Sequence, residues 1–226
     1  GLSYFWYSGV FLDIYIVIAR DVEIQILGDC NGNAIALSER DCSLQRRNQK
    51  VIEETPAPNL SDKTRLALKV AAENLAKQLT YKTAGTVEFI YDEKDEKFYF
   101  LEVNTRLQVE HPVTEMVTGL DLVELMIKVA ANCAPDFATF HVNLCGASME
   151  ARLYAENPVK DFRPSPGQIT NVEFPPWARV DTWVRKGTII SSEYDPLIAK
   201  IIVHCKDRAD ALQKLKDALN ETKVYG

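Results

Sequence analysis

Hydrophobic and polar residues alternate along residues 22–28, where Val and Ile are separated by Glu and Gln. After the turn-forming pair Asn31-Gly32, a second largely apolar run covers residues 34–37. Alternation on both sides of an Asn-Gly turn predicts a β-hairpin. Residues 39–50 are rich in arginine and have no helical apolar stripe, so a loop or an irregular strand is expected there.

Apolar residues spaced three and four apart predict three helices. Ser61 is a suitable N-cap for a helix that extends to about Thr80, and Asp207 is a suitable N-cap for a helix near the end of the chain. A third helix is expected over residues 120–131. Runs of residues that favour strands cover 86–92, 97–103, 148–154, 179–184 and 200–205.

Strands followed by helices, with charged residues on strand faces, indicate an α+β fold. The character of the sequence changes after Pro135, where turns that contain Pro and Gly separate short strands. A domain boundary is therefore expected within residues 135–147, with one domain over residues 1–140 and a second over residues 141–226.

The runs 86–92 and 97–103 flank a charged turn and predict a hairpin. If the pairing is symmetric about Asp95, Glu88 lies opposite Glu102, on the same face as Asn104. Like charges in such positions repel, and a divalent cation between them removes the repulsion. Two carboxylates and an amide oxygen suit Mg²⁺ or Mn²⁺ better than zinc, and magnesium with so few protein ligands usually binds substrate phosphates. A nucleotide-triphosphate site follows, unless the register is shifted by one residue and both glutamates are solvated.

The polar face continues beyond this hairpin. In an extended strand Glu102, Asn104, Arg106 and Gln108 all project to one side. A carboxylate, an amide and a guanidinium directed into one space are expected to serve an ion or an anion, because burying them without partners costs several kcal/mol.

The composition is that of a globular chain: 226 residues, 46% hydrophobic and 26% charged. A net charge of −6 argues against a nucleic-acid surface, which requires a basic face. The five cysteines are widely spaced, which predicts free thiols and a cytoplasmic location. The most apolar stretch, residues 5–19, is too short to span a membrane and carries Asp13, so a buried strand is expected there.

Five blocks of the sequence together resemble the biotin carboxylase family of ATP-grasp enzymes. They are ERDCSLQRRNQK (39–50), EETPAP (53–58), EVNTRLQVEHP (102–112), RLYAENP (152–158) and YDPLIAKIIV (194–203). The resemblance covers roughly residue 9 to the end. Within the family, the chain is most similar to the urea carboxylase part of fungal urea amidolyases.

The resemblance implies the C-terminal part of an ATP-grasp domain, followed by an incomplete biotin carboxylase C-terminal domain of mixed strands and helices. It implies carboxylation of biotin with bicarbonate through carboxyphosphate, with ATP and Mg²⁺ or Mn²⁺. The N-terminal domain and the Gly-rich lid of the family have no counterpart in the sequence. Biotin is expected on a carrier domain outside this chain, a carboxyltransferase domain is an expected partner, and a homo-oligomer is compatible with the resemblance.

The resemblance also implies roles for residues around the bicarbonate. Arg106 matches a residue that binds bicarbonate and takes part in catalysis, with Gln108 and the backbone of Val109 beside it. Glu110 matches the general base that deprotonates bicarbonate. Lys50 matches a catalytic position close to the bicarbonate and the phosphate.

For the metal, the resemblance implies the same ligands as the hairpin argument: Glu88, Glu102 and Asn104. For biotin, Arg152 matches the residue that holds the ureido oxygen as negative charge develops there.

Five residues fall at nucleotide-binding positions of the family: Asp13, Ile16, Asp21, Gln45 and Asn48. Three of them depart from the family pattern. Asp13 stands where a glutamate usually contacts adenine, and Asp21 and Asn48 each replace a histidine. Aspartate at position 21 adds negative charge near a negatively charged nucleotide.

The residues taken without the resemblance allow simpler readings. Arg106 and Glu110 could be an exposed pair, Arg152 a surface residue of a strand, and Lys50 a solvated lysine. His111 is interpreted as a structural hydrogen-bonding residue. Two other functions stay open: an ATP-grasp ligase that joins a carboxylate to an amine, and a non-catalytic remnant that acts as an interaction module.

Overall fold

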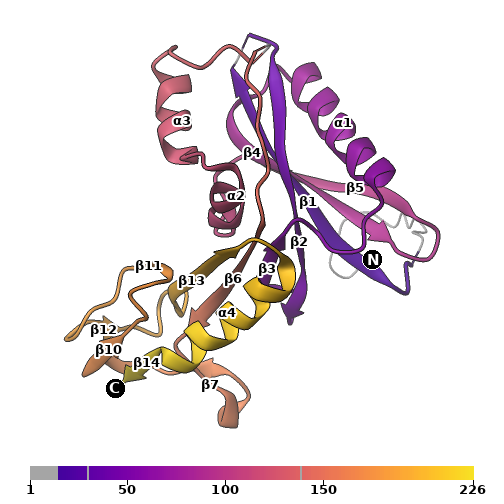
Figure 1. Ribbon diagram of the computed structural model, residues 1–226. Coiled ribbons are helices and arrows are strands. Elements are labelled where there is room, and N and C mark those ends of the chain that lie inside the picture. The colour runs from indigo at the N-terminus through magenta and orange to yellow at the C-terminus, as the bar shows by residue number, and fades with distance from the viewer. Residues whose placement is uncertain (1–14, 30, 138) are drawn as a thin grey trace, which may run out of the picture.

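An antiparallel sheet of eight strands runs through the chain in the computed structural model, which describes residues 15–29, 31–137 and 139–226 (Figure 1). In spatial order its strands are β11 (Arg179–Thr182), β13 (Leu197–Cys205), β6 (Ala147–Tyr154), β3 (Gln49–Thr55), β2 (Ala34–Arg46), β1 (Ala19–Asp29), β4 (Lys82–Asp92) and β5 (Lys97–Asn104). The pairing of β3 with β6 joins the first and second halves of the chain in one sheet.

Four helices and three small two-stranded sheets complete the described fold. The helices are α1 (Asp62–Gln78), α2 (His111–Thr118), α3 (Leu122–Ala130) and α4 (Arg208–Glu221), with one 3₁₀ turn at η1 (Pro158–Lys160). The small sheets pair β7 (Glu156–Asn157) with β8 (Arg163–Pro164), β9 (Gly167–Gln168) with β12 (Ile189–Ile190), and β10 (Asn171–Glu173) with β14 (Lys223–Tyr225). None of the described helices has the length and apolar character of a membrane span.

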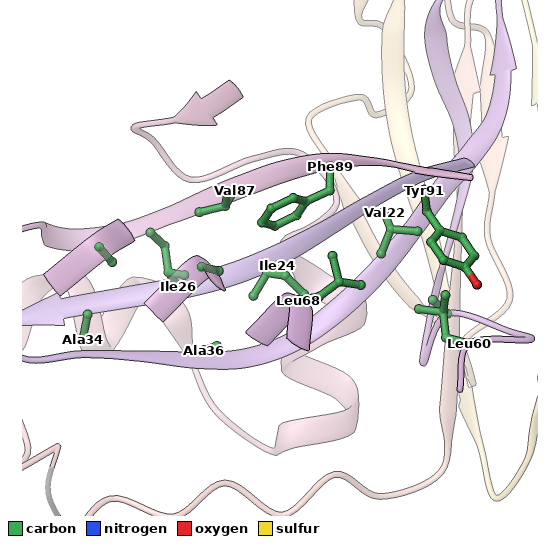
Figure 2. Packing of buried hydrophobic residues seen from close by; sticks show 13 residues of the cluster. Val22, Ile24, Ile26, Ala34, Ala36, Leu60, Leu68, Val87, Phe89 and Tyr91 are labelled. Carbon is green, nitrogen blue, oxygen red and sulfur yellow. The ribbon is translucent and has the colours of Figure 1, made fainter. Parts of the chain in front are cut away.

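Helix α1 closes one hydrophobic core against β1, β2 and β4 (Figure 2). Its predicted cap is confirmed, because the Ser61 hydroxyl accepts a hydrogen bond from the backbone N–H of Thr64 at 3.2 Å. Leu68 is fully buried on the inner face of the helix, and Figure 2 shows it close to Ile24 and Phe89 of the sheet. Burial of these side chains fixes the polar face of β1 and β4 on the other side.

The remaining helices pack at other positions on the same sheet. Helix α3 contacts β4, and α4 covers β6 and β13. Helix α2 packs against β2, β3, β6 and β13, next to the join between the two halves. Asp121 and Asp207 cap α3 and α4, so the three predicted helices are confirmed close to their predicted limits. The mixed strand and helix class is confirmed as well. Of the buried strand expected over residues 5–19, residues 5–14 lie outside the described residues. Residues 15–18 form no strand, and Tyr15, Val17 and Ile18 are exposed, so the expectation is wrong for the described part.

Residues 39–50 form an irregular strand pair rather than a loop. They complete β2 and begin β3, with shifts in the register between the two. Arg47 and Asn48, with φ of 53° and 61°, make the turn that connects these strands. The hydrophobic pattern does not predict these strands, because they bury charged residues in pairs, such as Arg40 with Glu23.

The polar strand is shorter than expected. β5 ends at Asn104, so the prediction of an extended strand through Gln108 is wrong for its last four residues. The chain turns there and begins α2, with Pro112 in the first turn of the helix, where its missing N–H costs no hydrogen bond.

Candidate functional site

A row of charged side chains crosses four neighbouring strands. Arg40 of β2 is paired in register with Glu23 of β1, Glu23 with Glu88 of β4, and Glu88 with Glu102 of β5. The predicted pairing of Glu88 with Glu102 is therefore confirmed, whereas an irregularity between Glu88 and Phe89 shifts the register by one residue nearer the turn. Residues paired in this way point to one face of the sheet, so three carboxylates gather beside one guanidinium.

Glu88 and Glu102 of this row line a cavity of about 670 Å³, large enough for a nucleotide-sized ligand. Most of the residues singled out from the sequence line it: Asp21, Gln45, Asn48, Lys50, Glu88, Glu102, Asn104, Arg106, Gln108, Val109, Glu110 and Arg152. Ile16 is described but does not line the cavity, and Asp13 lies outside the described residues.

Lys50 is the central cation of the site. Its ammonium donates hydrogen bonds to Glu23 at 2.7 Å, to Glu110 at 2.8 Å and to Glu88 at 3.0 Å. Burial alone would lower the pKa of Lys50. The nearby carboxylates, of which Glu23 has the largest effect, raise it by a greater amount, so the pKa lies well above the ordinary value. Lys50 therefore stays charged and holds three glutamates together, which excludes the reading of a solvated lysine.

Arg40 lies beneath the cavity and holds two residues of the site, Glu23 and Gln108, by hydrogen bonds. Its guanidinium is fully buried, and its Nε donates to Glu23 at 2.5 Å. The remaining nitrogens donate to Gln25, Thr86, Gln108 and Thr114 at 2.7–3.1 Å. Since every direction of the guanidinium is satisfied, Glu23 and Gln108 are held rigidly beneath the cavity.

The predicted metal ligands lie together at the open end of the row. The Asn104 side-chain amide donates to Glu88 at 2.9 Å and to Glu102 at 3.1 Å, so both carboxylates reach the same nitrogen. A half-turn of the amide would direct its oxygen into that space. These oxygen donors fit Mg²⁺ or Mn²⁺, and the partly exposed position leaves room for water or phosphate ligands.

A second acidic group has the spacing of a metal site, but a lysine ammonium already neutralises it. Ligand atoms of Glu23, Cys42 and Glu110 lie within 4.8 Å of one another, and all three residues are buried. The Lys50 ammonium already donates to both glutamates. Burial raises the pKa of Cys42 well above the ordinary value, which disfavours a thiolate ligand.

Glu110 is held between two cations at the start of α2. It is 2% exposed, and one carboxylate oxygen accepts from Lys50 while the other accepts from the Arg152 guanidinium at 3.1 Å. The His111 ring N–H donates to the Gln108 carbonyl oxygen at 2.7 Å, which agrees with its interpretation as a structural residue. The reading of Glu110 as an exposed residue is therefore wrong.

Arg106 differs from these buried groups because it is exposed at the cavity. The one hydrogen bond described for its guanidinium is a long contact of 3.4 Å to the Leu107 carbonyl. Gln108 is buried beside it and donates to Glu88 at 2.8 Å. An anion that enters the cavity therefore meets a guanidinium free to make two parallel hydrogen bonds.

Arg152 enters the site from the second half of the chain. Its Nε donates to Glu53 at 2.5 Å, and its other end reaches Glu110. Burial alone would lower the pKa of Arg152. Glu53 and Glu110 raise it by a greater amount, so the guanidinium remains charged. Arg152 is a half-buried residue paired with two carboxylates, rather than a surface one.

Asp21, Gln45 and Asn48 line the side of the cavity formed by β1 and the β2–β3 turn. The Gln45 amide donates to Asp21 at 2.9 Å, and Lys50 lies 4.0 Å from the same carboxylate. Burial raises the pKa of Asp21 to about 7, against the lowering effect of Lys50. Near neutral pH its carboxyl group is therefore close to half protonated, which reduces the charge that a nucleotide would meet.

Sequence reasoning missed several members of this network. Glu23 shares a strand face with Asp21, and its alternation with Val and Ile was a readable signal of a polar face. Glu53 and Glu150 carried no such signal, because their contact depends on the pairing of β3 with β6.

Two family models match the chain and together cover most of it. The model described as Carbamoyl-phosphate synthase L chain, ATP binding domain, matches residues 2–135, and Biotin carboxylase C-terminal domain matches residues 150–226. The chain belongs to the biotin carboxylase family. The resemblance inferred from its motifs is thus confirmed.

Relatives within the biotin carboxylase family agree in sequence and in fold. Urea amidolyase of Saccharomyces cerevisiae is 71% identical over 226 residues, which are 100% of this chain and 12% of that protein. The crystal structure of Kluyveromyces lactis urea carboxylase, also 71% identical, superposes with a TM-score of 0.91 and covers 92% of this chain and 18% of that one. This chain therefore spans a small part of these relatives.

A more distant member of the family has been solved with ligands. The biotin carboxylase domain of 2-oxoglutarate carboxylase from Hydrogenobacter thermophilus, in complex with MgADP, ADP and bicarbonate, has a TM-score of 0.89 at 42% identity. The match covers 94% of this chain and 47% of that one.

Proposed function

We propose that this chain supplies catalytic residues for the carboxylation of biotin with bicarbonate, as the biotin carboxylase part of a urea carboxylase. The observation that carries the proposal is the position of Glu110, which lies between Lys50 and Arg152 at the edge of a cavity that also holds the Glu88–Glu102 pair. The identity of 71% to urea amidolyase and urea carboxylase supports urea as the final acceptor.

Bicarbonate would bind where the exposed guanidinium of Arg106, the Gln108 side chain and the Val109 backbone meet. Glu110 would take the bicarbonate proton, and the oxygen so released would attack the γ-phosphorus of ATP. A new O–P bond forms, the bond between the γ-phosphorus and the bridging oxygen breaks, and ADP and carboxyphosphate result. Lys50, beside Glu110, would stabilise the negative charge on the transferring oxygens.

Glu88, Glu102 and Asn104 would hold Mg²⁺ or Mn²⁺, which when bound neutralises phosphate oxygens of the nucleotide. The repulsion between the two facing glutamates makes this position favourable for a cation. Asp21, Gln45 and Asn48 would contact the nucleotide from the opposite side of the cavity.

The C–O bond between the carboxyl carbon and the bridging oxygen of carboxyphosphate would then break to give CO₂ and phosphate. The N1′ atom of biotin would lose its proton to the phosphate and form a new N–C bond with CO₂. Arg152 would hold the ureido oxygen of biotin, a role for which its planar fork of N–H donors is suited. The biotin would arrive on a carrier domain, and a carboxyltransferase domain would use the product. The described cysteines are all free thiols, which supports a cytoplasmic location.

A chimaera tests the proposal directly. In it, this chain replaces the matching segment of Kluyveromyces lactis urea carboxylase, to which it is 71% identical. We expect ATP hydrolysis that requires bicarbonate, carboxylation of free biotin, and stimulation of turnover by urea. The Arg152→Lys variant keeps the positive charge but loses the planar set of N–H donors of the guanidinium. Its rate of biotin carboxylation should fall about 100-fold.

Arg163→Lys is the matched control, since Arg163 is exposed and lies outside the cavity. Its rate should remain near that of the unchanged chimaera. A chimaera that melts cooperatively but hydrolyses no ATP in response to bicarbonate would overturn the proposal.

A further inference from the structure

A second pair of glutamates faces each other where the two halves of the chain meet. Glu53 of β3 and Glu150 of β6 are register partners, and both are fully buried. Their neighbours Met149 and Ala151 point to the opposite face, into the core that α4 covers. Glu53 and Glu150 therefore lie on the face of the sheet that carries Arg152.

Within the part of the chain that the structure describes, one cation is bound to this pair, and it is bound to Glu53 only. Arg152 donates its Nε to one oxygen of Glu53 at 2.5 Å and uses its other end for Glu110. The second oxygen of Glu53 and both oxygens of Glu150 have no hydrogen-bond partner among the described residues. Over residues 15–29, 31–137 and 139–226, Glu150 thus has neither a bound cation nor a hydrogen-bond donor of its own.

The other charged groups on this face are engaged elsewhere. Lys200, the register partner of Arg152, donates to the Val109 carbonyl at 2.8 Å and lies 3.4 Å from Asp181. On α2, the carboxylate of Glu115 accepts from the Leu122 N–H and from Arg179, and the described hydrogen bond of the His111 ring goes to the Gln108 carbonyl.

Two ionised carboxylates facing each other in this interior would be strongly unfavourable, because each charge would lack most of its solvation. A single proton solves the problem, as it removes one charge and supplies an O–H donor for the unpaired oxygens. Burial raises the pKa of Glu53 to about 7, and burial together with Glu53 raises that of Glu150 well above its ordinary value. Both shifts agree with one retained proton.

We propose that Glu53 and Glu150 share one proton near neutral pH, with Glu150 as the acid and Glu53 as the carboxylate that holds Arg152. Glu150 carries the proton because Glu53 already accepts a charge-assisted bond, which favours its ionised form. The pair then presents one negative charge to the guanidinium, in a fixed direction. Glu150 is a positioning residue that acts through Glu53 on Arg152. This consequence for catalysis rests on the proposed function, whereas the shared proton does not.

Infrared spectroscopy of the chain tests the proton itself. At neutral pH, the difference spectrum between the wild type and Glu150→Gln should contain the C=O band of a protonated carboxyl group. Absence of that band would show that Glu150 is ionised and would overturn the proposal.

The pH dependence of stability gives a second readout. The folded pKa of Glu150 lies above its ordinary value, so its protonated form stabilises the fold at low pH, and this contribution is lost as pH rises through the folded pKa. Gln keeps a donor and does not titrate. The melting temperature of Glu150→Gln relative to the wild type should therefore increase steadily from about pH 5 to about pH 9. A constant difference over this range would contradict the shared proton.

The positioning role is measured in the chimaera. Glu150→Leu removes the donor to Glu53, so kcat/KM for biotin should fall at least tenfold, and Gln in place of Leu should recover most of that loss. Equal losses in both variants would overturn the positioning role. If the unchanged chimaera carboxylates no biotin, the proposed function fails, while the infrared and melting measurements still decide the shared proton.

Discussion

At the β4–β5 end of the sheet, Glu88 and Glu102 face each other beside an open cavity, whereas at the β3–β6 join Glu53 and Glu150 face each other in the interior. Glu102 is exposed, while both members of the inner pair are fully buried. The outer pair shares an amide donor from Asn104. The same cross-strand pairing of acids therefore occurs in two different environments.

The difference teaches that solvent access decides how a sheet compensates facing acids. An ion with water and phosphate ligands can reach the outer pair, so a metal is the natural counter-charge there. The inner pair is closed to an ion with its hydration shell, so a proton is the smaller counter-charge. Lys50 and Arg152 link the two regions, because both contact Glu110.

Lys50→Met should have the largest effect on this comparison. It leaves Glu23, Glu88 and Glu110 without their common cation, so the free energy of unfolding should fall by about 3 kcal/mol. Denaturant titration measures this loss. Lys128→Met on α3 is the matched control, since Lys128 is an exposed lysine paired with Glu124 at 2.7 Å, worth about 0.4 kcal/mol. Similar losses in the two variants would show that Lys50 is not the central cation.

Glu102→Gln should weaken Mn²⁺ binding at least tenfold, because it removes one of two carboxylate ligands. The free protein should become more stable by about 0.5 kcal/mol, since the repulsion across β4 and β5 is relieved. Calorimetric titration with Mn²⁺ and thermal melting check the two parts. Glu124→Gln, on the exposed face of α3, controls for loss of a surface charge. Unchanged Mn²⁺ affinity in Glu102→Gln would show that the metal does not bind at Glu88 and Glu102.

Asp21→Asn should have the smallest effect and should depend on pH. Because burial raises the pKa of Asp21 to about 7, the wild-type carboxyl group is neutral below this value and charged above it. Its stabilising contribution is lost as pH rises through about 7, and the charge then opposes a bound nucleotide. At about pH 8 the Asn variant of the chimaera should bind MgADP about fivefold more tightly than the unchanged chimaera, a difference of ~1 kcal/mol.

Near pH 6 this difference in affinity should disappear. Asp217→Asn, at an exposed position of α4, is the control for a general change in net charge. A fivefold difference that persists at low pH would mean that Asp21 does not titrate in this range.

Much of the outer pair could be predicted from the sequence. The charged turn around Asp95 lies between two β-prone runs, so the contact between Glu88 and Glu102 follows from local spacing. Helix caps such as Ser61 were predictable for the same reason, because a hydroxyl and the backbone it bonds lie three residues apart.

The inner pair could not be predicted in this way. Glu53 and Glu150 are far apart in the sequence, and the residues around them do not indicate the register of β3 against β6. The buried charges of β2 also hid that strand, since Arg40 and Glu23 satisfy each other without an apolar pattern. Motif resemblance could supply Arg152 and Glu110 as site residues, but the pairing of strands determines what holds them in place.

The ladder between β3 and β6 ties the proposed phosphate-activating end and the biotin end to one continuous sheet. Their spacing is set by main-chain hydrogen bonds rather than by a hinge, so any opening and closing around the reactants must come from segments outside this ladder. Cutting the chain within residues 135–147 would also remove β6 from β3. The exposed edge of β3 could then pair with a strand of another molecule.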